Sequence, residues 1–260
     1  MIVTPKFKMN RFFFFAALFF SGQAIANNAP AHPDTHELFV KANRAYDAGN
    51  LTQAITDYQS LLQNGSTRAP LYYNLGNAYF KQGDIGASIA AYLHATRESP
   101  RFADLKANLK TVREEVRDAI DSEQESILTA ILFFWYYKLS PSEFGTVALL
   151  TNLAFALLLI AAMYLPRNEY IPWLQKLTVI LLITSSASFL GRTYFPRQIA
   201  VVQAPEALVF SGTSSETTVL FKVHSGTEMR VQAKAPGWVR VQVNDQQGWL
   251  PETNVEVVSL

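Results

Sequence analysis

The chain has 260 residues, of which 49% are hydrophobic, 13% aromatic and 17% charged, and its formal net charge is +1. Charged residues fall below the roughly 25% of an average globular protein, so part of the chain is expected to be buried in something other than a protein core. The near-zero balance gives no sign of the basic face that nucleic-acid binding requires. Cysteine is absent, which excludes disulfides, thiolate metal sites, iron–sulfur clusters and a cysteine nucleophile.

The N-terminal segment, 1–26, has the order of a secretory signal peptide. A basic stretch holds Lys6, Lys8 and Arg11, an apolar run covers 12–20, and small residues precede a cleavage site after Ala26. The apolar run is shorter than the roughly 20 residues of a transmembrane helix. An uncleaved anchor is the alternative. Both interpretations place the following domain outside the cytoplasm.

Residues 37–109 show internal repetition. Gly49 and Gly83 are 34 positions apart, whereas Tyr46 and Tyr79 are 33 positions apart. We assign this difference of one residue to the turn between Tyr46 and Gly49. The second copy has the fuller pattern: Tyr72, Leu75, Gly76, Tyr79, Gly83, Asp84, Tyr92, Ala95 and Pro100. A period of about 34 residues with this pattern resembles the tetratricopeptide repeat. The resemblance implies helical hairpins that bury their apolar faces by stacking.

A third unit begins at Asn108-Leu109, one period after Asn74-Leu75. The charged segment that continues it, 110–121, shows no further motif and is expected to cap the stack. We therefore predict an all-α domain of tetratricopeptide-repeat hairpins with a capping helix at 37–120.

Three apolar segments follow. Residues 127–139 (ILTAILFFWYYKL) are too short to span a bilayer and predict an amphipathic helix lying at the membrane interface; a buried core helix is the alternative. Residues 144–165 carry no charge and predict a first transmembrane helix, and 171–190 predict a second, so that the two form a hairpin. Positive charges flank both sides of this hairpin, so the signal peptide decides its orientation. The repeats and the C-terminal domain are both expected on the periplasmic side of the inner (cytoplasmic) membrane.

From residue 199 to 260 the pattern changes to short β-rich segments separated by turns at Gly212, Gly226 and Gly237. We expect a small all-β barrel. Its order, and above all the strand Trp238-Val239-Arg240-Val241 followed by Gly248-Trp249-Leu250, resembles a bacterial SH3 domain. An unrelated small β-barrel is the alternative.

The whole layout resembles the BatE family of the bacterial aerotolerance (Bat) operons: signal peptide, tetratricopeptide repeats, membrane hairpin and terminal SH3-like domain. The pattern Phe39-x-x-Ala42-Asn43-x-x-Tyr46 and the run 71–79 (LYYNLGNAY) are also similar to that family. The resemblance implies a non-enzymatic member of an envelope complex. Its implied partners are other Bat-type membrane proteins that carry von Willebrand factor A-type domains and act beside a MoxR-type ATPase.

The sequence gives no positive sign of catalysis. It lacks the Gly-x-Ser-x-Gly, His-Glu-x-x-His, phosphate-loop and Gly-x-Gly-x-x-Gly patterns. His32 and His36 are four positions apart, but Pro33 interrupts them in a segment typical of a linker. We expect no enzyme activity, no cofactor and no metal.

Binding signals are stronger. The first helices of stacked repeats line the groove that usually takes a ligand, and the repeat spacing predicts six groove residues: Arg44, Tyr73, Asn74, Asn77, Phe80 and Asn108. Asparagine can bond an extended backbone as donor and acceptor; the alternative is that Asn74 and Asn108 only brace neighbouring helices. Trp238 and Trp249 are the aromatic candidates of the C-terminal domain, unless both belong to its core.

Two functions follow. The first is a membrane-anchored adaptor that recruits protein partners through the repeats and makes a second contact through the SH3-like domain. The alternative is a cell-wall module whose SH3-like domain binds peptidoglycan. Membrane lipid is a partner in both, and nucleic acid in neither.

Overall fold

The computed structural model describes residues 33–118, 138–164, 170–194 and 196–260. The predicted signal peptide at 1–26, the interfacial segment 127–139 apart from its last two residues, and residues 119–120 of the predicted capping helix lie outside this part of the chain. The chain divides into two compact units. One contains most of helices α9 and α10, and the other contains the repeats together with the C-terminal sheet.

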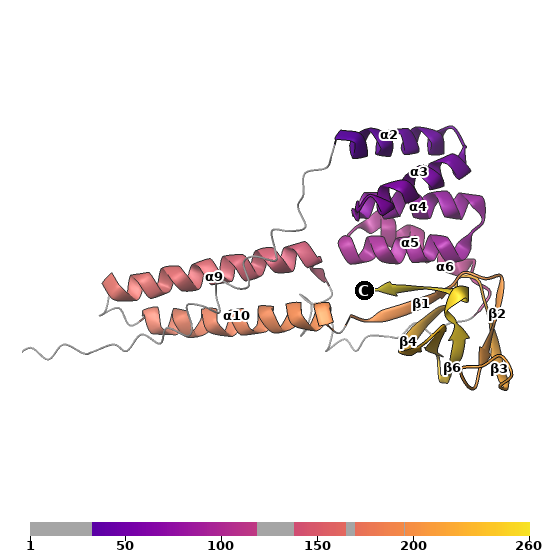
Figure 1. The fold of residues 1–260 in the computed structure, drawn as a ribbon. Coiled ribbons are helices and arrows are strands. Elements are labelled where there is room, and N and C mark those ends of the chain that lie inside the picture. Colours follow the sequence, from indigo (N-terminus) through magenta and orange to yellow (C-terminus); the bar gives the residue numbers. More distant parts are fainter. Residues whose placement is uncertain (1–32, 119–137, 165–169, 195) are drawn as a thin grey trace, which may run out of the picture. The chain divides into compact units, whose positions relative to one another are not determined.

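Five antiparallel helices form the N-terminal part of the second unit (Figure 1). They are α2 (Pro33–Asp47), α3 (Leu51–Gln63), α4 (Ala69–Gln82), α5 (Ile85–Glu98) and α6 (Ala103–Glu114). The turns α2–α3 and α4–α5, which join the helices of the two hairpins, have the same structure. Gly49 and Gly83 take left-handed backbone angles (φ 79° and 89°) after α2 and α4, a conformation that costs glycine little. Asn50 and Asp84 then cap α3 and α5 by accepting hydrogen bonds from Gln53 N and Ala87 N.

Close helix packing inside the second hairpin depends on Gly76. A Cβ atom at this position would lie 2.5 Å from Cε1 of Tyr92, a side chain with no exposed surface. Ser88 supports the same contact, because its Oγ donates to the carbonyl oxygen of Gly76 at 2.9 Å in the buried interior. The small residues of the repeat therefore let α4 and α5 approach around one buried ring.

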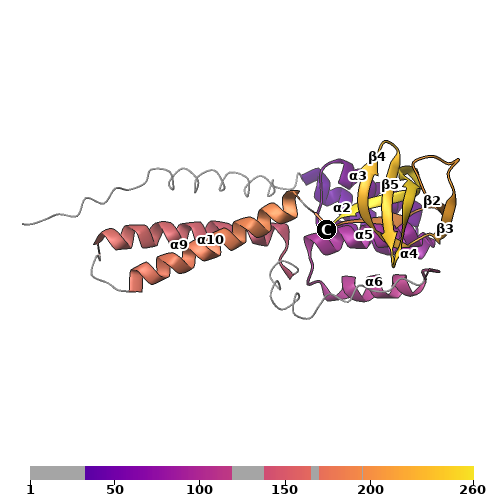
Figure 2. The same cartoon turned by 90° about the horizontal axis from the view of Figure 1, so that it is seen from below.

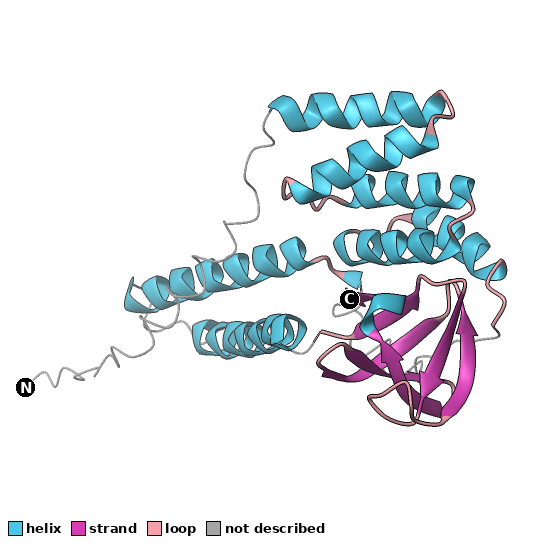
Figure 3. Ribbon diagram, turned by 45° about the vertical axis from the view of Figure 1, so that its right-hand side comes forward, coloured by secondary structure: helices cyan, strands magenta, loops and turns pink. Residues whose placement is uncertain are grey.

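The C-terminal part of the same unit is a seven-stranded antiparallel sheet, called the β-domain below (Figure 3). Its strands are β1 (Gln198–Val202), β2 (Glu206–Phe210), β3 (Val219–His224), β4 (Glu228–Ala235), β5 (Trp238–Val243), β6 (Gln246–Pro251) and β7 (Val255–Ser259), in the order β3-β2-β6-β5-β4-β1-β7. Asn244 turns the tight β5–β6 hairpin with φ 49°, which asparagine tolerates. The predicted all-β C-terminal region is confirmed, and its core is aliphatic, centred on Val209, Val239, Val241 and Leu250.

The β-domain packs directly on the last helices of the repeats (Figures 1 and 2). Ile89 of α5 and Leu105 of α6 share one buried cluster with Ile199, Val201 and Val258 of β1 and β7. Strand β7 is an edge of the sheet, and α5 lies against it. The repeats and the sheet, which we expected as separate modules, thus form one body in which the sheet covers the end of the helical stack and the stack covers a sheet edge.

Helix α9 (Pro141–Tyr164) and most of α10 (Tyr170–Tyr194) belong to the other unit. Among the described residues, one segment is long and apolar enough to cross a membrane, Ser142–Ala162 of α9. Its apolar side chains are largely exposed: Leu150 and Leu157 each show 58% of their surface. Gln175 of α10 donates through Nε2 to the carbonyl oxygen of Leu158 at 3.3 Å, which joins the two helices. The predicted span at 171–190 lies inside α10, but α10 is not both long and apolar enough to meet the criterion that α9 meets. The two-span hairpin therefore stays a prediction.

Candidate protein-binding site

The hydrogen bonds establish a uniform register for the repeats. Tyr58 donates to Asn43, and Tyr92 donates to Asn77 in the same way, at 2.7 and 2.6 Å. The two asparagines are therefore equivalent, and they are separated by the same full period as the two tyrosines. Aligning Tyr46 with Tyr79 gives a spacing between the two repeats that is one position too short. With that spacing Arg44 is the equivalent of Asn77, whereas in the structure Asn43 is its equivalent.

Four asparagines join the first helices of successive hairpins, α2, α4 and α6. Asn74 of α4 donates through Nδ2 to Oδ1 of Asn43 in α2 at 2.9 Å. One repeat later, Asn108 of α6 donates to Oδ1 of Asn77 in α4, also at 2.9 Å. We call Asn43, Asn74, Asn77 and Asn108 the asparagine ladder. Bracing of neighbouring helices, the alternative role considered for Asn74 and Asn108, is thus present.

Two buried tyrosines fix the orientation of the ladder. Burial raises the pKa of Tyr58 and Tyr92 to about 12, so both phenols remain neutral donors over the physiological range. Oδ1 of Asn43 and of Asn77 each accepts one phenol and one amide. This arrangement turns the Nδ2 groups of Asn43 and Asn77 away from the internal network, and within the described part of the chain neither has a hydrogen-bond partner. Each repeat therefore offers one preorganised amide donor on this face.

The other predicted groove residues divide into two groups. Tyr73 and Phe80 are half-buried and pack against the core, and the Tyr73 ring lies 4.9 Å from that of Phe102. The Tyr73 hydroxyl also accepts from Asn108 at 3.1 Å. Arg44 is exposed in the last turn of α2 and takes no part in the ladder's hydrogen bonds. The structure thus brings Tyr73, Asn74, Asn77 and Asn108 together and leaves Arg44 beside them.

A cation lies over an aromatic ring next to the ladder. Nζ of Lys81 on α4 is 4.0 Å from the centre of the Tyr46 ring on α2. The contact links the same two helices that Asn43 and Asn74 join, and it adds an apolar ring and a positive charge to this face.

The two tryptophans of the β-domain lie outside its aliphatic core. Val239 and Leu250 point into the core, and alternation along β5 and β6 places Trp238 and Trp249 on the opposite face, where both are half-buried. The Phe210 ring lies edge-on to Trp238 at 5.7 Å, and Phe210 is the register partner of Trp249. The three side chains form an aromatic patch in which the two tryptophans keep part of their surface accessible.

Polar contacts between the repeats and the β-domain were not anticipated from the sequence. Arg113 of α6 makes a bidentate ion pair with Glu228 of β4: Nε donates to Oε1 at 2.6 Å and Nη2 donates to Oε2 at 2.7 Å. Asp118 accepts from the backbone N–H of His224 at 2.7 Å and from the hydroxyl of Thr227. Although partial burial alone would raise the pKa of Asp118, these hydrogen bonds together hold it below the usual value.

No cluster of three or more histidine, cysteine, aspartate or glutamate side chains suited to a metal ion occurs in the residues that the structure describes.

Comparison with protein families agrees with the helical geometry. A family model described as TPR repeat matches residues 42–83, and one described as Tetratricopeptide repeat matches residues 69–102. No curated protein matches the chain. The two matches overlap in α4 and together run from the middle of α2 to the turn after α5. The helices that carry most of the asparagine ladder are therefore tetratricopeptide repeats.

Proposed function

We propose that the protein is a membrane-anchored envelope adaptor, without enzyme activity, that holds an extended segment of a partner protein on the asparagine ladder. The observation that carries the proposal is the pair of outward amide donors at Asn43 and Asn77, repeated once per hairpin and fixed by buried tyrosines. An extended polypeptide presents carbonyl oxygens that such donors can bond. Tetratricopeptide repeats are protein-binding scaffolds, which supports this use of the face.

The ladder has only two outward donors, so a partner needs further contacts for tight binding. The Lys81–Tyr46 pair offers a charge and a ring beside the ladder. Because the β-domain is packed on α5 and α6, any second contact made there is held at a fixed separation from the ladder. Two modest sites on one rigid body raise the effective concentration of the second contact.

The apolar helix α9 supports the proposed anchoring, because its segment Ser142–Ala162 is long and apolar enough to cross a membrane, and α10 is proposed as the returning span. In this proposed topology, which also includes the proposed signal peptide, the repeats and the β-domain, proposed here as SH3-like, both lie on the periplasmic side of the inner membrane. The layout resembles the BatE family, which makes Bat-type membrane proteins with von Willebrand factor A-type domains the proposed partners. In this account the protein is a non-catalytic member of an aerotolerance complex.

The structure also permits a more specific test than replacing the ladder asparagines by alanine. Replacing Asn43 and Asn77 by aspartate keeps the Oδ1 acceptor that Tyr58 and Tyr92 require, while it replaces each outward donor by a carboxylate oxygen. A matched control is Gln63→Glu with Asn64→Asp, which adds the same charge at exposed positions at the end of α3.

We would crosslink intact cells, purify the detergent-solubilised full-length protein and identify the captured membrane proteins. The proposal predicts that proteins with von Willebrand factor A-type domains are captured by the wild type and by the control, and are lost from the Asn43→Asp/Asn77→Asp variant. Equal capture by both double variants would show that the ladder is not the binding face.

A second function is favoured by the aromatic patch of Trp238, Trp249 and Phe210, because its two tryptophan rings are partly exposed and can stack on sugars. In this alternative the β-domain binds peptidoglycan. Sedimentation of the full-length protein with purified peptidoglycan, compared with a Trp249→Ala variant, separates the two functions. Retention of the wild type and release of the variant would support the cell-wall function, whereas no retention of either would remove it.

A further inference from the structure

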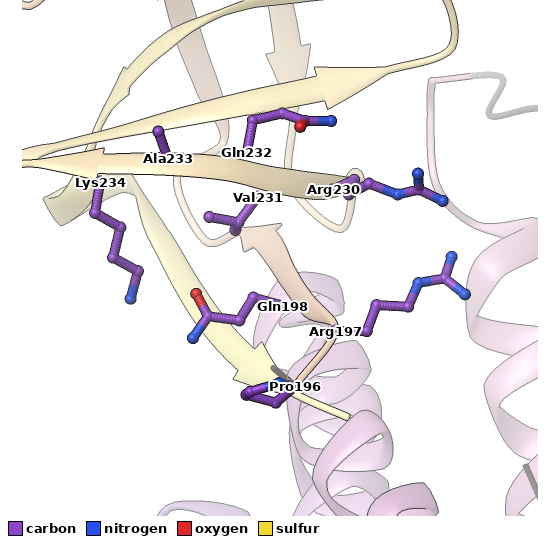
Figure 4. Close-up of a pocket in the computed structure, with 8 residues that line it drawn as sticks. All are labelled: Pro196, Arg197, Gln198, Arg230, Val231, Gln232, Ala233 and Lys234. Carbon is purple, nitrogen blue, oxygen red and sulfur yellow. The ribbon is translucent and has the colours of Figure 1, made fainter. Parts of the chain in front are cut away.

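A hollow of about 390 Å³ opens on the β-domain where the start of β1 meets the middle of β4 (Figure 4). Strand β4 runs on past its pairing with β1, which ends at the Ile199–Arg230 pair, so the side chains beyond this pair have no neighbouring strand on that side. Eight residues line the hollow: Pro196, Arg197, Gln198, Arg230, Val231, Gln232, Ala233 and Lys234.

The lining is strongly basic. It contains three cations, Arg197, Arg230 and Lys234, and no acidic residue. All three are exposed, and the close-up shows the two guanidinium groups at one end of the hollow and Lys234 toward the other (Figure 4). The acidic residue of β4, Glu228, is engaged on both oxygens by Arg113 of α6. An anion in the hollow would therefore meet only positive charge among the ionisable groups of the lining.

The apolar and amide groups between these cations complete the site. Val231 lies between the basic ends (Figure 4), and Gln198 and Gln232 add amide groups to the lining. The hydrogen bonds of these amides, to Ser259 Oγ at 3.5 Å and to Gln242 Oε1 at 2.6 Å, each use one N–H of the two. Guanidinium groups and amide donors suit the oxygens of a phosphate group.

The chain itself limits how far this site can lie from the end of helix α10. Tyr194 is the last residue of α10, and Arg197 follows three positions later. Three extended residues span at most about 10 Å. If α10 ends at a membrane surface, Arg197 is held within the depth of the lipid headgroup region.

We propose that this basic hollow binds the phosphate of an anionic lipid headgroup, such as phosphatidylglycerol, and so holds the β-domain against the membrane. The proposal rests on the membrane anchoring proposed above. The two guanidinium groups at one end of the hollow recognise a phosphate monoanion, and the ammonium group of Lys234 adds attraction from the other end (Figure 4). The short link to α10 selects the membrane as the source of this phosphate.

The test uses the full-length protein in a detergent with a neutral headgroup. Native mass spectrometry would count bound short-chain phosphatidylglycerol, phosphatidylcholine and inorganic phosphate. The test variant is Arg230→Gln with Lys234→Gln, and the control is Lys106→Gln with Lys110→Gln, which removes two exposed charges from α6. The attraction of each cation to an anionic lipid is large enough that removing two cations should weaken the binding of phosphatidylglycerol by about thirty-fold.

We expect the wild type and the control to bind phosphatidylglycerol in preference to phosphatidylcholine, and the test variant to bind it about thirty-fold more weakly. Equal binding by both double variants would overturn the proposal, because general charge would then explain the effect. Displacement of the lipid by equimolar inorganic phosphate would overturn the assignment to lipid. Release of the wild type from cell membranes by alkaline carbonate would refute the anchoring itself, whereas retention there with unchanged binding in the test variant would refute the hollow alone.

Discussion

Gly86 lies where helix α5 touches the β-domain, and its replacement by alanine tests whether the two parts form one body. A Cβ atom at this position would overlap the carbonyl oxygen of Val202 in β1 and would lie 2.9 Å from Oγ of Ser225. The obstacle on one side is backbone, which cannot rotate away. The N–H of Gly86 also donates to Oγ of Ser225 at 3.2 Å. Alanine therefore has to push α5 and β1 apart.

The expected magnitude follows from opposing effects. Alanine favours a helix over glycine by up to about 1 kcal/mol. Overpacking costs about 1–3 kcal/mol, and loss of the Gly86–Ser225 hydrogen bond adds about 1 kcal/mol. The net change is a loss of about 1–3 kcal/mol in the free energy of unfolding. For a body of this size the melting temperature should fall by about 2–12 °C.

The assay is thermal unfolding of the detergent-solubilised full-length protein, followed by circular dichroism and by tryptophan fluorescence, to which Trp238 and Trp249 of the β-domain contribute two of the four tryptophans. Ser225→Ala serves as the control, since it removes the hydrogen bond without adding a clash and should cost only about 1 kcal/mol. An unchanged or raised melting temperature for Gly86→Ala would refute the reasoning, because it would mean that α5 and β1 are not in this contact.

Three further predictions concern the repeats and their junction with the β-domain. Gly76→Ala should lower the free energy of unfolding by about 1–3 kcal/mol in a denaturant titration, because the new Cβ would lie 2.5 Å from the buried Tyr92 ring; wild-type stability would contradict this packing. Burial raises the pKa of Tyr58 and Tyr92 to about 12 from 10.0. Their contribution to stability should therefore be complete below pH 10.0 and be lost as the pH rises toward 12. A Tyr58→Phe/Tyr92→Phe variant should lose this alkaline dependence. Hydrogen bonds hold the pKa of Asp118 below 3.8, so its contribution should be present above pH 3.8 and lost as the pH falls below it; acid titration of Asp118→Asn should lack this component, and an unchanged acid profile would contradict it.

The repeats could be predicted because their signals are local and periodic. Glycine and aromatic residues recur at fixed spacing, and each has a direct steric reason, such as the contact of Gly76 with Tyr92. The register failed by one position because the tyrosine at position 46 was aligned with Tyr79, whereas a uniform period aligns it with Phe80. The signal that corrects the error was present in the sequence: Asn43 precedes Asn77 by the same interval by which Asn74 precedes Asn108.

The packing of the β-domain on the repeats could not be predicted from local patterns. Gly86 and Ser225 are 139 residues apart, and Asp118 and His224 are 106 apart. Helix α6 shows the limit of the local pattern. The charged segment 110–121 was expected to form a capping helix, but α6 spans Ala103–Glu114 and residues 115–118 are not helical. Its Leu105, Leu109 and Val112 lie on one face at helical spacing and are buried in the cluster shared with β1 and β7.

The central claim, that a partner lies along the ladder face, is tested most directly by site-specific photocrosslinking in living cells. Thr111 lies one repeat period after Asn77 and is exposed on the equivalent turn of α6, while Thr56 is exposed on α3. Both hydroxyls bond the carbonyl four positions earlier, so a photoreactive side chain at either position removes the same kind of hydrogen bond. We predict a partner adduct from position 111 and none from position 56. Adducts from position 56 alone, or from both positions equally, would contradict it.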